Sequence, residues 1–181
     1  MLPRRETTET PCRAAGRIPT AAAFFAGCAA AAAVRGVLPY VLSAKFRRDL
    51  HALNAGNYRP LLANYASDAV LRFNEGAHRW SGEHRGKQEI ERFLRDFTAA
   101  GLQGEIHQLF VVGPLWRMTL VVRFDDHATG PDGQQLYRNR TVLLIRTRWG
   151  RIVHHEDFYE DTGRIETLEN RLRSLNIQPI R

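Results

Sequence analysis

The chain has 181 residues, of which 44% are hydrophobic and 25% are charged, and its net charge is +7 at pH 7. This length allows one domain with a tail, whose core is large enough to fold without a disulfide or a structural metal. Both cysteines, Cys12 and Cys28, lie near the N-terminus, which excludes a disulfide-built body and fits a reducing compartment. The arginines are scattered without a basic or aromatic cluster, so we do not expect nucleic-acid binding.

Residues 1–40 are predicted to be a disordered or alanine-rich tail outside the folded domain. Residues 1–17 are polar, with prolines and a glycine, which is typical of disorder. Residues 18–34 are mostly alanine, and as a helix they would span about 26 Å, less than the roughly 30 Å hydrocarbon core of a membrane. We expect a marginal alanine helix or a misassigned start codon, and a cytoplasmic protein. The alternatives are an export signal or a lipid anchor near Cys28, which would bring the protein to a membrane.

Residues 41–162 are predicted to form the folded domain, and residues 163–181 a closing helix and a tail. Apolar side chains recur at helical spacing at Phe46, Leu50 and Leu53, and this helix is expected to end within residues 54–57. A second short helix begins at Pro60. A strand at residues 69–73 and a short strand at 78–80 follow as a hairpin, and residues 86–97 again have helical spacing.

After residue 104 the pattern is that of strands until the closing helix. The predicted strands are residues 105–112, 116–125, 134–148 and 151–159, with turns at 130–133 and 149–150. The closing helix turns Ile165, Leu168 and Leu172 inward. This order predicts an α+β fold, in which three helices pack on one face of a strongly curved antiparallel sheet and form a cone.

The last predicted strand contains the most informative segment, residues 154–161, which read His-His-Glu-Asp-Phe-Tyr-Glu-Asp. Strand alternation places His155, Asp157 and Tyr159 on one face and the intervening side chains on the other. Adjacent histidines on a strand point apart, and no other pair has the spacing of metal ligands, so we expect no metal site.

Asp157 is the strongest candidate for a catalytic group. Burial in an apolar cavity raises the pKa of a carboxyl group, which can then act as a general acid or base near neutral pH. His155 shares the face of Asp157, and histidine is suited to moving protons near neutrality. The alternative for Asp157 is an ion pair with Arg140 or Arg146 that orders the sheet.

Several short motifs occur in a characteristic order: residues 65–70 (YASDAV), Gly76, residues 82–87 (GEHRGK), 150–152 (GRI) and 156–161 (EDFYED). Together they resemble the nuclear transport factor 2-like superfamily, and most closely its SnoaL-like and ketosteroid-isomerase-like members, over about residues 42–162. The resemblance implies a cystatin-like α+β roll whose cone accepts one small apolar molecule. This fold hosts isomerases, dehydratases, cyclases, epoxide hydrolases and non-catalytic binding modules.

The resemblance also implies particular site residues. Asp157 occupies the strand position where epoxide hydrolases of this superfamily place a catalytic Asp, and Arg140 matches the Arg of their Arg-x-Asp element. The third residue of that element is Val142 here, which disfavours epoxide hydrolysis. The residues expected to line the cone, with ordinary core packing as the alternative for most of them, are Tyr65, Leu71, Phe73, Trp80, Trp116, Met118, Leu120, Val142, Leu144 and Tyr159.

Two functions are compatible with these features. The first is a cofactor-free isomerase, cyclase or dehydratase, in which Asp157, assisted by His155 and Arg140, moves a proton on a bound apolar carbonyl compound. The second is a non-catalytic ligand-binding or dimerisation module with the same cone. In both cases we expect a small apolar ligand, no cofactor, and a homodimer formed through the outer face of the sheet.

Overall fold

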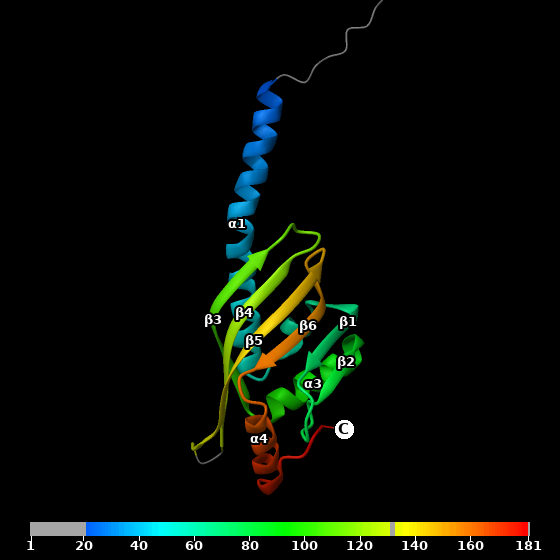
Figure 1. Cartoon of the computed structure of the whole chain (residues 1–181), viewed down its shortest axis with the longest axis vertical. Helices are drawn as coiled ribbons and strands as arrows, with labels where there is room; N and C mark the ends of the chain where they lie inside the picture. Colours follow the sequence, from blue (N-terminus) through cyan, green and yellow to red (C-terminus); the bar gives the residue numbers. More distant parts are fainter. Residues whose placement is uncertain (1–20, 131–132, 181) are drawn as a thin grey trace, which may run out of the picture. The chain divides into compact units, whose positions relative to one another are not determined.

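The computed structural model describes residues 21–130 and 133–180 (Figure 1). The chain divides into two units, residues 1–37 and residues 38–181. The long helix α1, Ala21–Asn54, begins in the first unit, where the alanine-rich segment is helical from Ala21 onward. The predictions for residues 1–20, including disorder, lie outside the described residues. None of the helices in the described part of the chain is both long and apolar enough to cross a membrane.

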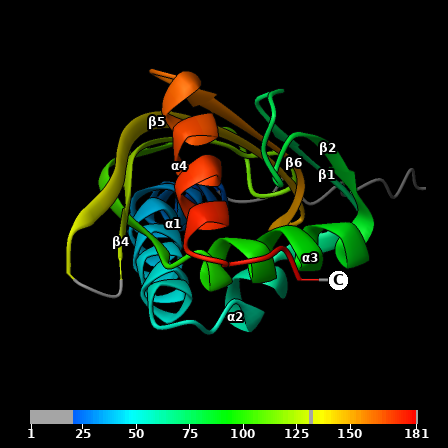
Figure 2. The same cartoon turned by 90° about the horizontal axis from the view of Figure 1, so that it is seen from below.

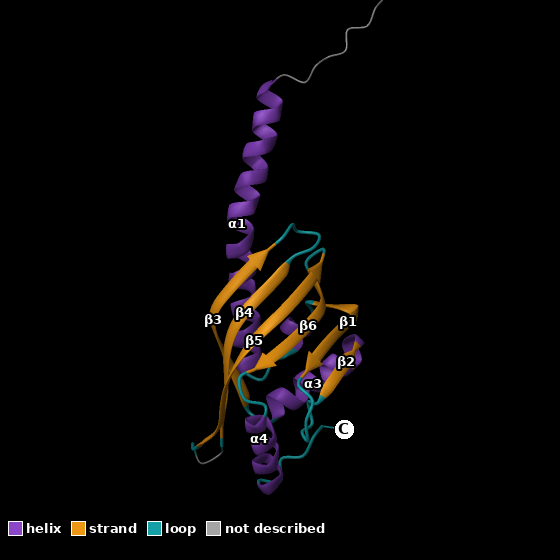
Figure 3. Ribbon diagram, viewed as in Figure 1, coloured by secondary structure: helices purple, strands orange, loops and turns teal. Residues whose placement is uncertain are grey.

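The second unit is built on a curved, open sheet, for which the described residues supply six strands (Figure 3). The strand order is β2-β1-β6-β5-β4-β3, and the strands are β1 Tyr65–Phe73, β2 Gly82–Arg85, β3 Leu102–Val112, β4 Thr119–Thr129, β5 Gln135–Arg148 and β6 Arg151–Tyr159. Neighbouring strands are antiparallel apart from β1 and β6, which run parallel. The α+β fold is therefore confirmed, with one parallel pair that brings β1 beside the informative strand β6.

Helices cover the concave face of this sheet (Figure 2). They are the C-terminal part of α1, α2 (Arg59–Leu62), α3 (Gly86–Ala99) and, at one end, α4 (Gly163–Ser174). The buried apolar side chains of these helices and of the sheet form one continuous core. As predicted, Ile165, Leu168 and Leu172 of α4 face this core, and each is at most 1% exposed.

The end of α1 is fixed by its sequence and by side-chain bonds to the sheet. The helix stops at Asn54, as predicted, and Gly56 takes the positive φ of +84° that ends such helices. The Asn54 side chain donates to the carbonyl of Gly104 (2.8 Å) and accepts from its N–H (2.9 Å). Arg47 donates to the carbonyl of Ile106 at 2.9 Å. These bonds tie the C-terminal part of α1 to β3 across the concave face.

The N-terminal hairpin differs from the prediction. Its second strand is Gly82–Arg85, whereas residues 78–80, expected to be that strand, form a turn. The turn is held by Arg79, whose Nε donates to Glu169 Oε2 of α4 at 2.7 Å, so tertiary contacts bury its residues without strand pairing.

Strand limits differ elsewhere by a few residues. β1 begins at Tyr65 rather than at residue 69, and β4 begins at Thr119 rather than at residue 116. The turn at residues 149–150 is confirmed, with positive φ at both Trp149 and Gly150. Of the turn predicted at residues 130–133, residues 131–132 lie outside the described residues.

Candidate functional site

A small cavity of about 50 Å³ lies inside the second unit, between the concave face of the sheet and the helices α1 and α3. Most of its wall is apolar, and its polar side chains come from the parallel neighbours β1 and β6. The residues that line it are Phe46, Leu50, Leu53, Leu61, Tyr65, Leu71, Phe93, Leu94, Phe97, Phe124, Leu143, His155, Asp157 and Tyr159. The cavity thus places a short polar strip against an apolar wall, which is typical of small-molecule sites.

His155 stands between a tyrosine and a carboxylate at this wall. The Tyr65 hydroxyl lies 2.6 Å from His155 Nδ1, and burial raises the pKa of Tyr65, so the tyrosine remains a donor. A neutral imidazole that accepts at Nδ1 carries its proton on Nε2. That atom lies 2.8 Å from Asp157 Oδ1, but the two are not aligned as a hydrogen bond.

Asp157 Oδ1 and His155 Nε2 are therefore buried polar atoms without a hydrogen-bond partner among the described residues. The side chains are 7% and 11% exposed, respectively. Unsatisfied buried polar atoms are uncommon in native structures, and at a cavity wall they are available to a ligand. The predicted convergence of His155, Asp157 and Tyr159 on one face is confirmed by this geometry.

Asp126 of β4 forms a second buried acidic group behind Tyr159. The Tyr159 hydroxyl donates to Asp126 Oδ2 at 2.9 Å, and the Tyr137 hydroxyl approaches the same oxygen at 3.3 Å. Burial raises the pKa of Asp126 to about 7, and the charge of Asp157 adds to the rise, while the bond from Tyr159 acts against it. Asp126 therefore exchanges its proton near neutral pH.

Asp126 and Tyr137 are interior residues that the sequence reasoning missed. The predicted β4 alternation stopped at residue 125, although the same period carried one step beyond Phe124 places Asp126 on the interior face. In β5 the buried side chains are the odd-numbered ones, beginning with Tyr137. Extending the β4 alternation by one step would have identified Asp126, whereas Tyr137 lies on the face of β5 opposite to the one predicted to be interior.

Other residues predicted to line the cone have different positions. Leu71 is fully buried and lines the cavity, and Phe73 packs on Tyr159 with ring centroids 5.0 Å apart. Trp80 is 1% exposed and is packed in the core beside Arg79, so it is not a rim residue. Trp116 is exposed and lies beside Trp149, away from the cavity.

The predictions for even-numbered residues of β5 were wrong. The β5–β6 register places Leu143 opposite Asp157, so Leu143 faces the cavity and Val142 and Leu144 face outward. Arg140 is exposed on the outer side, where its Nε donates to Glu160 Oε2 at 2.8 Å. Arg140 therefore cannot assist Asp157.

The sheet-ordering alternative for Asp157 fails for the same reason. Arg146 is also exposed on the outer side of β5, and the titratable side chain next to Asp157 is His155. Because Val142 faces outward, its identity does not bear on the chemistry of the interior. In the described part of the chain, no group of three potential ligands is placed to hold a metal ion.

The pKa of Asp126 predicts a pH dependence of stability. The folded value of about 7 lies above the unfolded value of about 3.9, so the folded state binds the extra proton. The resulting stabilisation is complete below about pH 4, declines as the pH rises, and is gone above about pH 7, a loss on the order of 4 kcal/mol. Urea unfolding of the wild type and of Asp126→Asn at pH 3.5, 6 and 8 measures it. We expect the two curves to coincide at low pH and the variant to gain relative stability at pH 8. If the free energies of unfolding of the wild type and the variant differed by the same amount at all three pH values, the raised pKa of Asp126 would be contradicted.

A sequence profile of the SnoaL-like domain matches residues 46–155. The chain belongs to the SnoaL-like domain family. Comparison of this SnoaL-like protein with curated protein sequences gives no match.

Solved structures similar to the SnoaL-like protein share its fold at low sequence identity. A nuclear transport factor 2-like protein of unknown function from Burkholderia pseudomallei is 21% identical, with a TM-score of 0.57 over 70% of this chain and 95% of that one. A protein with a cystatin-like fold from Methylobium petroleophilum is 17% identical, with a TM-score of 0.54 over 68% and 78%. TerC, co-crystallised with polyporic acid, is 17% identical, with a TM-score of 0.52 over 67% and 92%. The predicted resemblance to the nuclear transport factor 2-like superfamily is confirmed.

Proposed function

We propose that the SnoaL-like domain binds a small apolar carbonyl compound in its interior cavity and moves a proton on it without a cofactor, as an isomerase, cyclase or dehydratase does. The observation that carries this proposal is the pair Asp157 Oδ1 and His155 Nε2, buried and without hydrogen-bond partners among the described residues, at the wall of a mainly apolar cavity. The co-crystallisation of TerC with polyporic acid supports an organic ligand for this fold.

In the proposed reaction, Asp157 removes a proton from the carbon next to the carbonyl group. The electron pair of the broken C–H bond forms the enolate, and Asp157 returns the proton to a carbon atom of the same molecule. His155, oriented by Tyr65, places its Nε2 proton beside Asp157 and steadies the carboxylate.

Tyr159 is the proposed donor to the carbonyl oxygen, where negative charge develops. It lines the cavity and contacts Asp126 behind it. When Asp126 is protonated, it can donate to the Tyr159 oxygen, which frees the Tyr159 proton for the ligand. Because the pKa of Asp126 is raised to about 7, this arrangement is lost as the pH rises above neutrality.

Exchange of ketone protons with solvent tests the proposal without knowledge of the natural substrate. The narrow ketones 2-butanone, 2-hexanone and 2-octanone are incubated with the protein in D2O, and loss of the α-proton signal is followed by NMR. We expect exchange faster than in buffer, with a rate that declines above about pH 7. Binding without exchange would instead support the non-catalytic module of the same fold.

We also propose a homodimer formed through the outer face of the sheet. This face exposes Phe110, Val112, Val142 and Phe158, and the last two are cross-strand partners. Exposed apolar side chains that adjoin one another are typical of interaction surfaces. Light scattering is expected to give twice the 20.6 kDa chain mass for the wild type and a single chain mass for Phe158→Glu. Trp149→Glu, at an exposed turn, is the control and should remain dimeric; a monomeric wild type would contradict the proposal.

A cytoplasmic location is proposed because residues 38–181, which form the second unit, contain no cysteine. N-terminal sequencing of natively expressed protein tests it. A mature chain that starts after residue 27 would contradict it and would indicate export or lipid anchoring.

A further inference from the structure

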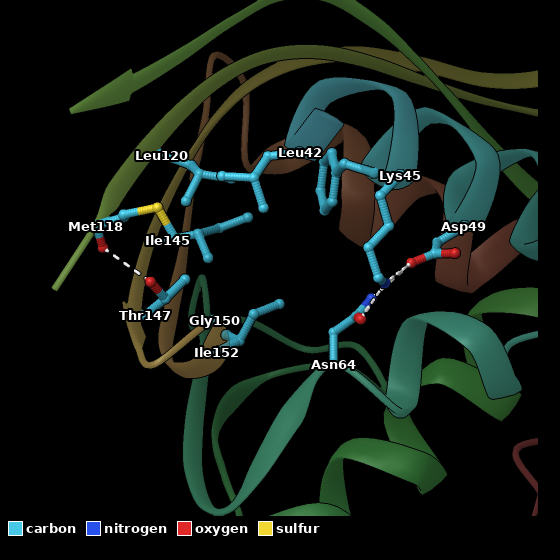
Figure 4. Close-up of a pocket in the computed structure, with 11 residues that line it drawn as sticks. Leu42, Lys45, Asp49, Asn64, Met118, Leu120, Ile145, Thr147, Gly150 and Ile152 are labelled. Carbon is cyan, nitrogen blue, oxygen red and sulfur yellow. Dashed lines mark hydrogen bonds and ion pairs between the residues drawn. The ribbon is translucent and has the colours of Figure 1, made fainter. Parts of the chain in front are cut away.

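A second cavity of about 60 Å³ lies near the β5–β6 turn, on the same concave side of the sheet (Figure 4). Apolar side chains, among them Leu120, Ile145 and Ile152, form one side of it. Lys45, Asp49 and Asn64 face them from the other side. We call this the outer cavity, and the cavity at Asp157 the inner cavity.

On the polar side of the outer cavity, Lys45, Asp49 and Asn64 contact one another. Lys45 Nζ lies 2.5 Å from Asp49 Oδ2 and also donates to Asn64 Oδ1, and Asn64 Nδ2 donates to Asp49 Oδ2 at 2.8 Å. Burial acts to raise the pKa of Asp49, but the bonds from Lys45 and Asn64 outweigh it and hold this pKa below its usual value. An ammonium group has three N–H donors, and the Lys45 side chain is 44% exposed, so the third donor is open to solvent and to a ligand. Asp49 also lies 3.6 Å from Arg48 Nε, so it offsets the charge of Lys45 only in part, and the remaining donor suits an oxygen acceptor such as a carbonyl, hydroxyl or carboxylate oxygen.

The outer and inner cavities lie next to each other along α1 and β5. On α1, Leu42 lines the outer cavity and Leu50 the inner one. On β5, Ile145 lines the outer cavity and Leu143 the inner one, and these are successive inward-facing positions. Phe46 lines both cavities. Phe46 therefore borders both cavities, which lie along one trough beneath α1.

The dimensions of the trough define its ligand. From Leu42 to Leu53 the helix rises about 16 Å, and β5 extends about 14 Å from Leu143 to Thr147. Each cavity alone has room for only about four or five water molecules at roughly 10–15 Å³ each. A compact ligand of ordinary size fits neither cavity, whereas a narrow ligand that displaces the Phe46 ring can use both.

We infer that the two cavities are the halves of one elongated binding site, which takes a narrow, mainly apolar molecule with a carbonyl group at its inner end and an oxygen acceptor at Lys45. Phe46 sets the length of ligand that binds. The position of the inner carbonyl group rests on the proposed function, but the elongated site itself does not.

Calorimetric titration with methyl ketones of rising chain length tests the inference. The series is 2-butanone, 2-hexanone, 2-octanone and 2-decanone, and the proteins are the wild type and Phe46→Ala. Each methylene buried adds about fourfold in affinity. We expect this increase to level off early in the wild type and to continue to 2-decanone in the variant. The variant should bind 2-decanone at least tenfold more tightly than the wild type does, with 2-butanone changed less than twofold. A variant-to-wild-type ratio that is the same for all four ketones would overturn the inference.

Two further variants locate the long chain. Leu42→Trp, introduced into Phe46→Ala, fills the outer cavity from the helix side and should cancel the gain for 2-decanone. A gain that persists in this double variant would overturn the inference, because the chain would then lie elsewhere. Phe46→Leu should show the same chain-length dependence with a smaller gain, and it replaces Phe46→Ala if that variant does not fold.

These titrations require no turnover, so their failure is distinct from failure of the proposed function. A chain-length-dependent gain without proton exchange would leave the elongated site in place and remove the catalytic proposal. Proton exchange without that gain would keep the catalytic proposal and remove the elongated site.

Discussion

Replacement of Asp157 by asparagine is expected to slow ketone α-proton exchange by about 10²–10⁴-fold, the usual contribution of a general base. The amide has the shape of the carboxylate but cannot accept the proton. Asp157 lines the inner cavity, and its Oδ1 has no hydrogen-bond partner among the described residues, so the substitution leaves few contacts broken. NMR-detected exchange in D2O measures the rate, and the melting temperature reports the fold.

Asp68→Asn is the matched control, because Asp68 is an exposed aspartate that pairs with Arg148 at the surface. Its exchange rate should equal that of the wild type. A folded Asp157→Asn protein with a rate within twofold of the wild type would show that Asp157 is not the base. Loss of the fold in Asp157→Asn would instead indicate that the contact with His155 is structural.

Arg79→Ala is expected to lower the free energy of unfolding by up to about 3–5 kcal/mol, because it removes the buried cation of the Glu169 carboxylate and leaves only the more exposed Arg173 beside it. Arg79 and Glu169 form a buried ion pair, with side chains 2% and 1% exposed. Arg79 Nη2 also donates to the carbonyl of Ile177 at 2.8 Å. Burial acts to raise the pKa of Glu169, but the bonds from Arg79 and Arg173 hold it below its usual value. Urea unfolding at pH 7 measures the loss.

The control is Arg164→Ala, which removes an exposed arginine of α4, the helix that carries Glu169. Arg164 lies 3.1 Å from Asp161, and both side chains are about half exposed. Exposed pairs of this kind contribute about 0–1 kcal/mol, so its unfolding curve should barely move. A loss below 1 kcal/mol for Arg79→Ala would contradict the structural role of the buried pair, which joins α4 to the turn at residues 78–80.

The sequence predicted which side chains of a strand face the interior where one face of that strand is clearly the buried one. In β6 the alternation correctly separated His155, Asp157 and Tyr159 from their neighbours. In β5 it failed, because both faces carry apolar residues in the middle of the strand, Leu143 and Ile145 on one and Val142 and Leu144 on the other. A shift of one residue exchanges the two faces, and only the pairing of Leu143 with Asp157 decides between them.

Other features of the site depend on tertiary contacts that no local pattern contains. The parallel pairing of β1 with β6 brings Tyr65 to His155, although 90 residues separate them. The contact of Phe46 with both cavities depends on how one ring packs between α1 and the sheet. Helix spacing predicted that Phe46 faces inward, but not that it borders two cavities.

A carbon-detected NMR titration tests the proposed proton-transfer site most directly. The protein is labelled at the aspartate carboxyl carbons. Asp126→Asn assigns the Asp126 resonance by its disappearance. We expect the Asp126 carboxyl to titrate with a midpoint near pH 7, since burial raises its pKa to about 7. A midpoint near pH 4, the value of an ordinary solvated aspartate, would show that water reaches this carboxyl and would contradict the proposed proton-transfer site.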